Sequence, residues 1–187
     1  MTHMKLFDLS AQKSQFLLID AQEKLVPMVE NERKFLRNVK ILLKACELME
    51  IPVKYTEHYP SGLGATVKEL LDGMPQNSRS FEKIHFSCCE EKDFHTFLQF
   101  AGRDQIIVAG IETHICVLQT VSDLINQEYQ VFVAADACSS RNIENHNMAL
   151  ETMRQFGAVV LPTESIIYRL LRRAGTQTFK SLLPYFK

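Results

Sequence analysis

Short, unbroken apolar runs alternate with amphipathic helical segments along the chain, and this alternation limits the possible folds most strongly. Residues 16–19 form such a run directly before an acid, and residues 130–136 form another that itself ends in an acid. Strands that are buried on both faces of a parallel sheet have this pattern. Residues 31–49 instead place their apolar side chains three and four positions apart, which is typical of an amphipathic helix.

The alternation predicts right-handed βαβ crossovers, because parallel neighbouring strands need a crossing segment between them. We therefore expect an α/β fold with three αβα layers, in which a Rossmann-like, six-stranded, mostly parallel sheet carries helices on both faces. The expected strands are residues 16–19, 52–56, 78–83, 106–109, 130–136 and 158–161. The expected helices are residues 31–49, 66–71, 93–101, 116–125, 147–156 and 162–171, with a polar loop at 137–145.

Length and charge narrow the classes of protein. The chain has 187 residues, which suits a single domain spanning residues 1–187. A formal net charge of −1 argues against nucleic acid or an anionic membrane as the main partner. The apolar runs are too short to span a bilayer, and the first residues lack a basic-then-apolar signal pattern. Five cysteines without a CxxC pair indicate reduced thiols, so we expect a cytoplasmic protein, with organellar targeting left open.

Three reactive side chains lie at or just beyond the ends of predicted strands. Cys116 follows the strand at 106–109 and should lie in the first turn of a helix. The positive end of a helix dipole lowers the pKa of a thiol, and its free N–H groups stabilise an oxyanion. Asp20 and Lys83 end two other strands, at the edge where open α/β sheets bind ligands. Asp20 would accept the thiol proton, and Lys83 would hold both negative groups.

Asp20 and Lys83 also have ordinary structural interpretations. An aspartate at the position of Asp20 often caps a helix, and residues 22–28 could begin one. A lysine such as Lys83 is usually solvated. Only their shared edge of the sheet favours chemistry over these alternatives.

The loop after the second strand, residues 57–64, contains proline, serine and two glycines. His58 beside Glu57 has the chemistry of a metal ligand, but a metal site needs further ligands, and none lies nearby at a recognisable spacing. We therefore expect a substrate-facing or structural loop without a metal. The glycine-rich fingerprints of nucleotide-binding folds are absent as well, so the sequence predicts no cofactor.

Four segments in one order carry a family resemblance: residues 17–22, 81–83, 110–117 and 135–140. In these segments the chain resembles the isochorismatase-like cysteine hydrolases, the superfamily that includes isochorismatase, nicotinamidase and N-carbamoylsarcosine amidase. The loop at 57–64 is similar to that of the isochorismatase domain-containing proteins, a subgroup that includes sequences once labelled as a ribonuclease.

The resemblance implies a site and an assembly. Asp20, Lys83 and Cys116 would be the catalytic triad. A cis peptide bond would join Ile111 and Glu112 and would turn the Glu112 N–H toward the substrate oxygen. Together with the N–H of Cys116 it would form the oxyanion hole. The family also implies a homo-oligomer.

The expected reaction is hydrolysis of a small-molecule amide or related C–N bond through a thioester on Cys116. The loop lacks the Asp-x-His pattern of nicotinamidases, which argues against a catalytic metal, and the cysteine argues against the vinyl ether chemistry of isochorismatase. Two alternatives stay open: a non-catalytic interaction protein that keeps the hydrolase fold, and a nucleic-acid enzyme. By position alone, the candidate pocket residues are Tyr55, His58, Tyr59, Leu63, Phe86 and His114, of which His114 is equally well explained as a structural residue at a helix start.

Overall fold

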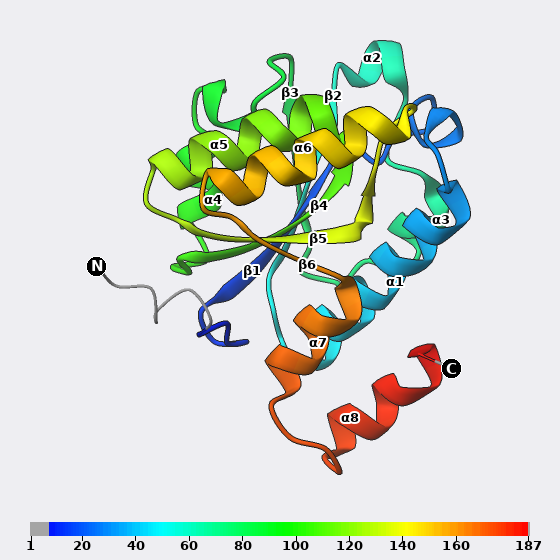
Figure 1. Cartoon of the computed structure of the whole chain (residues 1–187), viewed down its shortest axis with the longest axis vertical. Helices are drawn as coiled ribbons and strands as arrows, with labels where there is room; N and C mark the ends of the chain where they lie inside the picture. The colour runs from blue at the N-terminus through cyan, green and yellow to red at the C-terminus, as the bar shows by residue number, and fades with distance from the viewer. Residues whose placement is uncertain (1–7, 187) are drawn as a thin grey trace.

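A six-stranded sheet lies at the centre of the computed structural model, which we describe for residues 8–186 (Figure 1). The strand order is β3-β2-β1-β4-β5-β6, and every pairing between these strands is parallel. The predicted α/β class with helices on both faces is therefore confirmed. The strands are β1 (Ser14–Ile19), β2 (Val53–His58), β3 (Arg79–Lys83), β4 (Gln105–Ile111), β5 (Gln130–Ser139) and β6 (Val159–Leu161).

Helices cover both faces of the sheet and enclose two apolar cores (Figure 1). One core lies under α1 (Glu32–Leu48), α3 (Lys68–Leu71), α7 (Thr163–Leu171) and α8 (Gln177–Leu182). The other lies under α4 (Phe94–Gln99), α5 (Leu118–Asn126) and α6 (Ile143–Gln155). The short helix α2 (Pro60–Leu63) follows β2, and the remaining turns are Val26–Met28, Cys88–Glu90, Thr113–Val117 and Leu183–Phe186.

The central strand β1 belongs to both cores. Leu18 packs in the core under α1, whereas Leu17 and Ile19 pack in the core under α5, and all three are fully buried. Alternate side chains of a strand point to opposite faces, so a strand in a doubly covered sheet must be apolar throughout. Each such side chain stabilises the fold by about 1.5–3 kcal/mol. This requirement is why the apolar runs predict the sheet correctly.

The parallel arrangement brings reactive residues to one edge. At the carboxyl end of β1, Ile19 lies opposite Gly110 of β4, and His58 of β2 lies opposite Lys83 of β3. The residue after Ile19 is Asp20. Asp20, Lys83 and the segment after β4 therefore leave the sheet on the same side.

The structure corrects one predicted boundary. Helix α6 begins at Ile143, and β5 continues to Ser139, where the sequence suggested a polar loop from residue 137 to residue 145. Asn142 is the reason, because its side-chain oxygen accepts hydrogen bonds from the N–H groups of Glu144 and Asn145 at 2.8 and 3.0 Å. An asparagine at this position satisfies N–H groups that have no partner inside the helix and so starts α6 early.

Replacing this cap should weaken the fold. Asn142→Ala is expected to lower the free energy of unfolding by about 1 kcal/mol, because two N–H groups lose their acceptor. Urea unfolding followed by circular dichroism measures the change. Asn147→Ala, at an exposed position inside the same helix, is the control and should leave stability unchanged or slightly raised. An equal loss in both variants would contradict the assigned cap.

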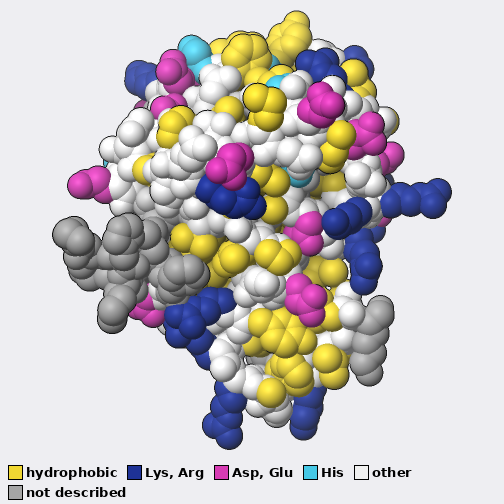
Figure 2. Space-filling model, viewed as in Figure 1, with side chains coloured by type: hydrophobic (Ala, Val, Ile, Leu, Met, Phe, Trp, Pro, Cys, Tyr) yellow, Lys and Arg dark blue, Asp and Glu magenta, His cyan; other side chains and the backbone are white. Residues whose placement is uncertain are grey.

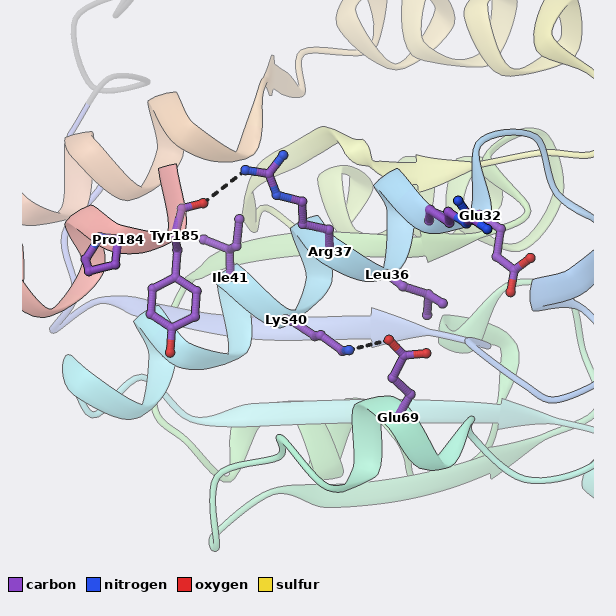
Figure 3. Close-up of a pocket in the computed structure, with 9 residues that line it drawn as sticks. Glu32, Leu36, Arg37, Lys40, Ile41, Glu69, Pro184 and Tyr185 are labelled. Carbon is purple, nitrogen blue, oxygen red and sulfur yellow. Dashed lines mark hydrogen bonds and ion pairs between the residues drawn. The ribbon is translucent and has the colours of Figure 1, made fainter. Parts of the chain in front are cut away.

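The C-terminal segment packs on its own chain. Leu182 is fully buried in the core under α1, and the ring of Tyr168 lies 6.1 Å from Phe179 and 5.5 Å from Phe186. Arg37 of α1 donates a hydrogen bond to the carbonyl of Tyr185 at 3.2 Å (Figure 3). Figure 2 shows apolar side chains at this end of the molecule, between lysines and arginines. No helix within residues 8–186 is long and apolar enough to cross a membrane.

Candidate active site

Asp20 is the buried centre of the site. It follows β1 with a positive φ of 52°, and its side chain is fully buried. Oδ1 accepts a hydrogen bond from the Thr56 hydroxyl at 2.7 Å, and Oδ2 lies 2.7 Å from Nζ of Lys83. A buried carboxylate needs such partners, because an unpaired charge in the interior is costly. Asp20 is therefore placed as a charged group rather than as a helix cap.

Lys83 is the cationic partner, and it is not solvated. Its side chain is fully buried, and Nζ also donates to the carbonyls of His85 and Phe86 at 3.1 and 3.2 Å. Burial is the largest single influence on the pKa of Lys83 and lowers it. The charge and hydrogen bond of Asp20, with smaller contributions from Cys88 and Cys116, together outweigh burial and raise that pKa above its ordinary value. Glu91 fixes this loop by accepting hydrogen bonds from the N–H groups of Ile84 and His85.

Cys116 lies in a π-helical turn, Thr113–Val117, between β4 and α5. Its side chain belongs to the core under α5, and the residue is 6% exposed. Burial, followed by the negative charge of Asp20, raises the pKa of this thiol, and Lys83 only partly offsets the effect. The sequence suggested a lowered pKa from a helix start. Burial beside a carboxylate reverses that direction, so the resting group is a thiol next to Asp20.

The peptide bond between Ile111 and Glu112 is cis, at the turn that precedes Cys116. The Glu112 carboxylate is turned toward the loop after β5, where Oε2 accepts a hydrogen bond from the N–H of Arg141 at 2.9 Å and pairs with its guanidinium at 3.5 Å. His114 makes a hydrogen bond with Ser140 at 3.0 Å. These contacts tie the cysteine turn to the start of α6. They give His114 a hydrogen-bonding partner.

The loop after β2 is held by a residue that the sequence did not single out for this role. Gln22, which is fully buried, accepts a hydrogen bond from the N–H of His58 at 2.8 Å. It also donates to the carbonyls of His58 and Gly64 at 2.9 and 2.7 Å. Glu57 is occupied as well, because its Oε1 accepts hydrogen bonds from the N–H and hydroxyl of Thr66. Glu57 is therefore part of the loop's framework and is not directed at His58.

His58 keeps one nitrogen without a partner. Its Nδ1 is buried and has no hydrogen-bond partner among residues 8–186, and its ring centroid lies 5.6 Å from that of Phe86. Burial, together with the charge of Lys83, lowers the pKa of His58 below its ordinary value. The imidazole is therefore neutral at neutral pH and can donate or accept one further hydrogen bond.

The other predicted pocket residues divide into two groups. Tyr59 and Phe86 are about half exposed, at 51% and 54%, and Leu63 lies in the adjoining helix α2. Tyr59 and Lys83 both line an open depression of about 370 Å³. Tyr55 differs, because its side chain packs against the core under α1. The structure therefore places Tyr59 and Phe86 beside Lys83, and Tyr55 on the opposite face of β2.

Two neighbours of Asp20, Lys83 and Cys116 carry no sequence motif of their own. Thr56 binds Asp20, as described above, and its hydroxyl lies 4.0 Å from Sγ of Cys88. Burial raises the pKa of Cys88 to about 12, so this second thiol stays protonated at neutral pH. The contact between Thr56 and Asp20 could be predicted from a threonine on β2 that faces the end of β1. That prediction requires the register between the two strands, which the sequence does not give.

The sheet thus carries a buried thiol and a buried Asp20–Lys83 pair at its carboxyl edge. The chain belongs to the isochorismatase family, because the Isochorismatase domain model matches residues 14–165. Isochorismatase domain-containing protein 2A of Mus musculus is 36% identical over 180 residues, which cover 94% of this chain and 84% of the mouse protein. The predicted family is therefore confirmed.

Solved structures have the same fold. The MAR1 ribonuclease of Caenorhabditis elegans superposes with a TM-score of 0.87 at 32% identity and covers 95% of this chain and 91% of its own. The YcaC gene product of Escherichia coli, described as an octameric hydrolase of unknown specificity, has a TM-score of 0.88 at 24% identity. It covers 95% of this chain and 89% of its own, and at this identity it supports the fold alone.

Proposed function

We propose that this protein hydrolyses a small-molecule amide or related C–N bond through a thioester on Cys116. The observation that carries the proposal is the fully buried Asp20–Lys83 pair beside a thiol whose pKa is raised. A charge pair of this kind contributes little to stability compared with apolar packing, so its retention next to a nucleophile favours chemistry. The site matches the hydrolase fold of the family.

The chemistry begins with a proton transfer. Asp20 takes the proton of Cys116 as the thiolate attacks the substrate carbonyl. The backbone N–H groups of Glu112 and Cys116 stabilise the oxyanion. As the C–N bond breaks, Asp20 returns the proton to the leaving nitrogen. Asp20 then removes a proton from the water that attacks the thioester and transfers it to the sulfur of Cys116 as the C–S bond breaks, which releases the acid and restores the thiol. Lys83 stabilises the Asp20 carboxylate in each step in which it is deprotonated.

The substrate enters beside the loop after β2. His58 offers its unpartnered Nδ1 to a polar group of the substrate, and Tyr59 and Phe86 offer exposed rings. Leu63 and His114 complete the proposed surroundings, whereas Tyr55 contributes only through the packing of β2. We propose that no metal and no cofactor take part, because the Glu57 carboxylate beside His58 is already bound by Thr66.

Ammonia release tests the proposal. An amide and carbamoyl library is assayed with the unmodified protein, with Cys116→Ala and with the control Cys46→Ala, whose thiol lies in the core on the other face of the sheet. We expect at least one compound to be turned over, with activity abolished in Cys116→Ala and retained in Cys46→Ala. Turnover that survives in Cys116→Ala, or its absence across the library, would contradict a cysteine hydrolase.

The name of the C. elegans structure favours a second candidate, a ribonuclease. The formal net charge of −1 argues against it, since RNA binding relies on phosphate contacts by Lys and Arg. RNA binding that weakens with salt and cleavage that requires Cys116 would support this candidate. A non-catalytic interaction protein remains the third, and it predicts neither activity.

We also propose a homo-oligomer, which the octameric description of the E. coli relative supports for the family fold. Size-exclusion chromatography with light scattering measures the assembly directly. The proposed compartment is the cytoplasm, because a thiol nucleophile has to stay reduced.

A further inference from the structure

Two cations lie side by side at the amino-terminal edge of the sheet, opposite the candidate active site. Lys54 near the start of β2 is the direct register partner of Arg79 at the start of β3. Both approach the ring of Phe97 in α4, so they lie on the same face of the sheet. Like charges directly opposite on neighbouring strands repel each other. No carboxylate within residues 8–186 forms an ion pair with either residue.

Lys54 is buried without a counter-charge. The residue is 2% exposed, and Nζ donates hydrogen bonds to Oε1 of Gln15 at 2.6 Å and to the carbonyl of Leu98. Both acceptors are neutral. Burial, together with the charge of Arg79, lowers the pKa of Lys54 to about 8. The Lys54 ammonium therefore has hydrogen-bond acceptors but no negative partner. Its positive charge attracts anions to the neighbouring surface.

Arg79 is held in place by aromatic rings. Its guanidinium carbon lies 4.4 Å from the ring centroid of Phe100 and 5.5 Å from that of Phe97. Phe100 is 77% exposed, which is unusual for a phenylalanine. A guanidinium that stacks through its face keeps its N–H edge available for a planar, two-oxygen acceptor.

A pocket joins these features. Its volume is about 540 Å³, within the range of small-ligand sites, and its lining includes Lys54, Arg79, Phe100, Asn77 and Ser78. Asn77 adds a side-chain amide beside the two cations, whereas the Ser78 hydroxyl already donates to the carbonyl of Pro75 at 2.7 Å. Two acids, Glu47 and Glu50, line the adjoining depression, and Glu47 is partly neutralised because it is paired with Lys44 at 2.6 Å.

We infer that this pocket binds a small oxyanion, a carboxylate or phosphate group, carried on an aromatic or otherwise apolar ligand. The oxygens pair with the N–H edge of Arg79 over the buried charge of Lys54, and the apolar part lies against Phe100. The anion would relieve the repulsion between the two cations. This site is separate from the thiol chemistry at the other edge of the sheet and does not rest on it.

The test uses separate probes on the full chain. Benzoate, inorganic phosphate and the neutral benzyl alcohol are each titrated at low salt near pH 7, and amide shifts are followed by heteronuclear NMR. We expect saturable shifts at Ser78, Arg79 and Ala101 with benzoate, weaker ones with phosphate, and none with benzyl alcohol. Phosphate binding more tightly than benzoate would assign the site to phosphate groups, within the same oxyanion chemistry.

Matched variants decide between a site and a charged surface. Arg79→Gln, at an exposed position, should weaken benzoate binding about tenfold or more, since it removes a charged hydrogen-bonding partner. Lys54→Met should weaken it as well, and Lys68→Gln, an exposed lysine on α3, should leave it unchanged. Shifts that never saturate, or an affinity that Arg79→Gln leaves intact, would overturn the inference.

Discussion

Asp20→Asn is expected to reduce turnover by roughly 10³-fold while making the thiolate of Cys116 easier to form. The two effects run in opposite directions because the carboxylate has two roles. Asp20 is the proposed proton acceptor, but its negative charge also raises the pKa of the neighbouring thiol. Removing the charge lowers that pKa while it removes the base. The pH dependence of iodoacetamide alkylation at Cys116, resolved by peptide mass spectrometry, measures the shift without a known substrate.

Lys83→Met is the matched comparison. It removes the positive charge that partly offsets the effect of Asp20, so the pKa of Cys116 should rise further. Turnover should fall here too. Either substitution breaks the buried pair and should cost about 3–5 kcal/mol of stability, so both variants need a check by urea unfolding before labelling. Alkylation midpoints that move in the same direction in the two variants would contradict this electrostatic arrangement.

Gly110→Ala is expected to lower the free energy of unfolding by about 3 kcal/mol or more. Gly110 has a φ of 139°, and a Cβ at this position would lie 2.2 Å from the carbonyl oxygen of Ile19. The obstacle is backbone of the central strand β1, which cannot rotate away as a side chain can. Urea unfolding measures the loss, and the yield of folded protein gives a second readout.

Gly102→Ala separates steric contact from backbone strain. Gly102 also has a positive φ, of 61°, but a Cβ there would meet no atom within 4 Å. It should therefore cost only about 1 kcal/mol, from the left-handed backbone alone. Similar losses in the two variants would mean that the close approach of β4 to β1 is not what requires glycine.

Strand positions follow from sequence because a doubly covered sheet demands unbroken apolar runs. Residues 16–19 and 106–109 satisfy that demand, and both lie inside strands of the structure. Residues 142–146 lack the apolar spacing that predicts a helix. The helix begins there because the side chain of Asn142 caps it. The spacing of apolar residues predicts which positions are buried. It cannot predict a helix start that depends on a single side-chain oxygen.

The candidate site divides in the same way. That Asp20, Lys83 and Cys116 leave the sheet at one edge follows from strand ends and parallel pairing. The contact of Thr56 with Asp20, and the clamp of Gln22 on the loop after β2, depend on the register between β1 and β2. The register depends on how side chains pack across the sheet, and this packing cannot be predicted from a short stretch of sequence.

The sequence by itself determined the layered α/β fold and the edge at which its reactive groups meet, because both depend on which residues can be buried. Only the tertiary structure decided the protonation of Cys116. A thiol's pKa is a sum of burial and of charges brought from other strands, here those of Asp20 and Lys83. For this chain, burial and the Asp20 carboxylate outweigh Lys83, so Cys116 rests as a thiol.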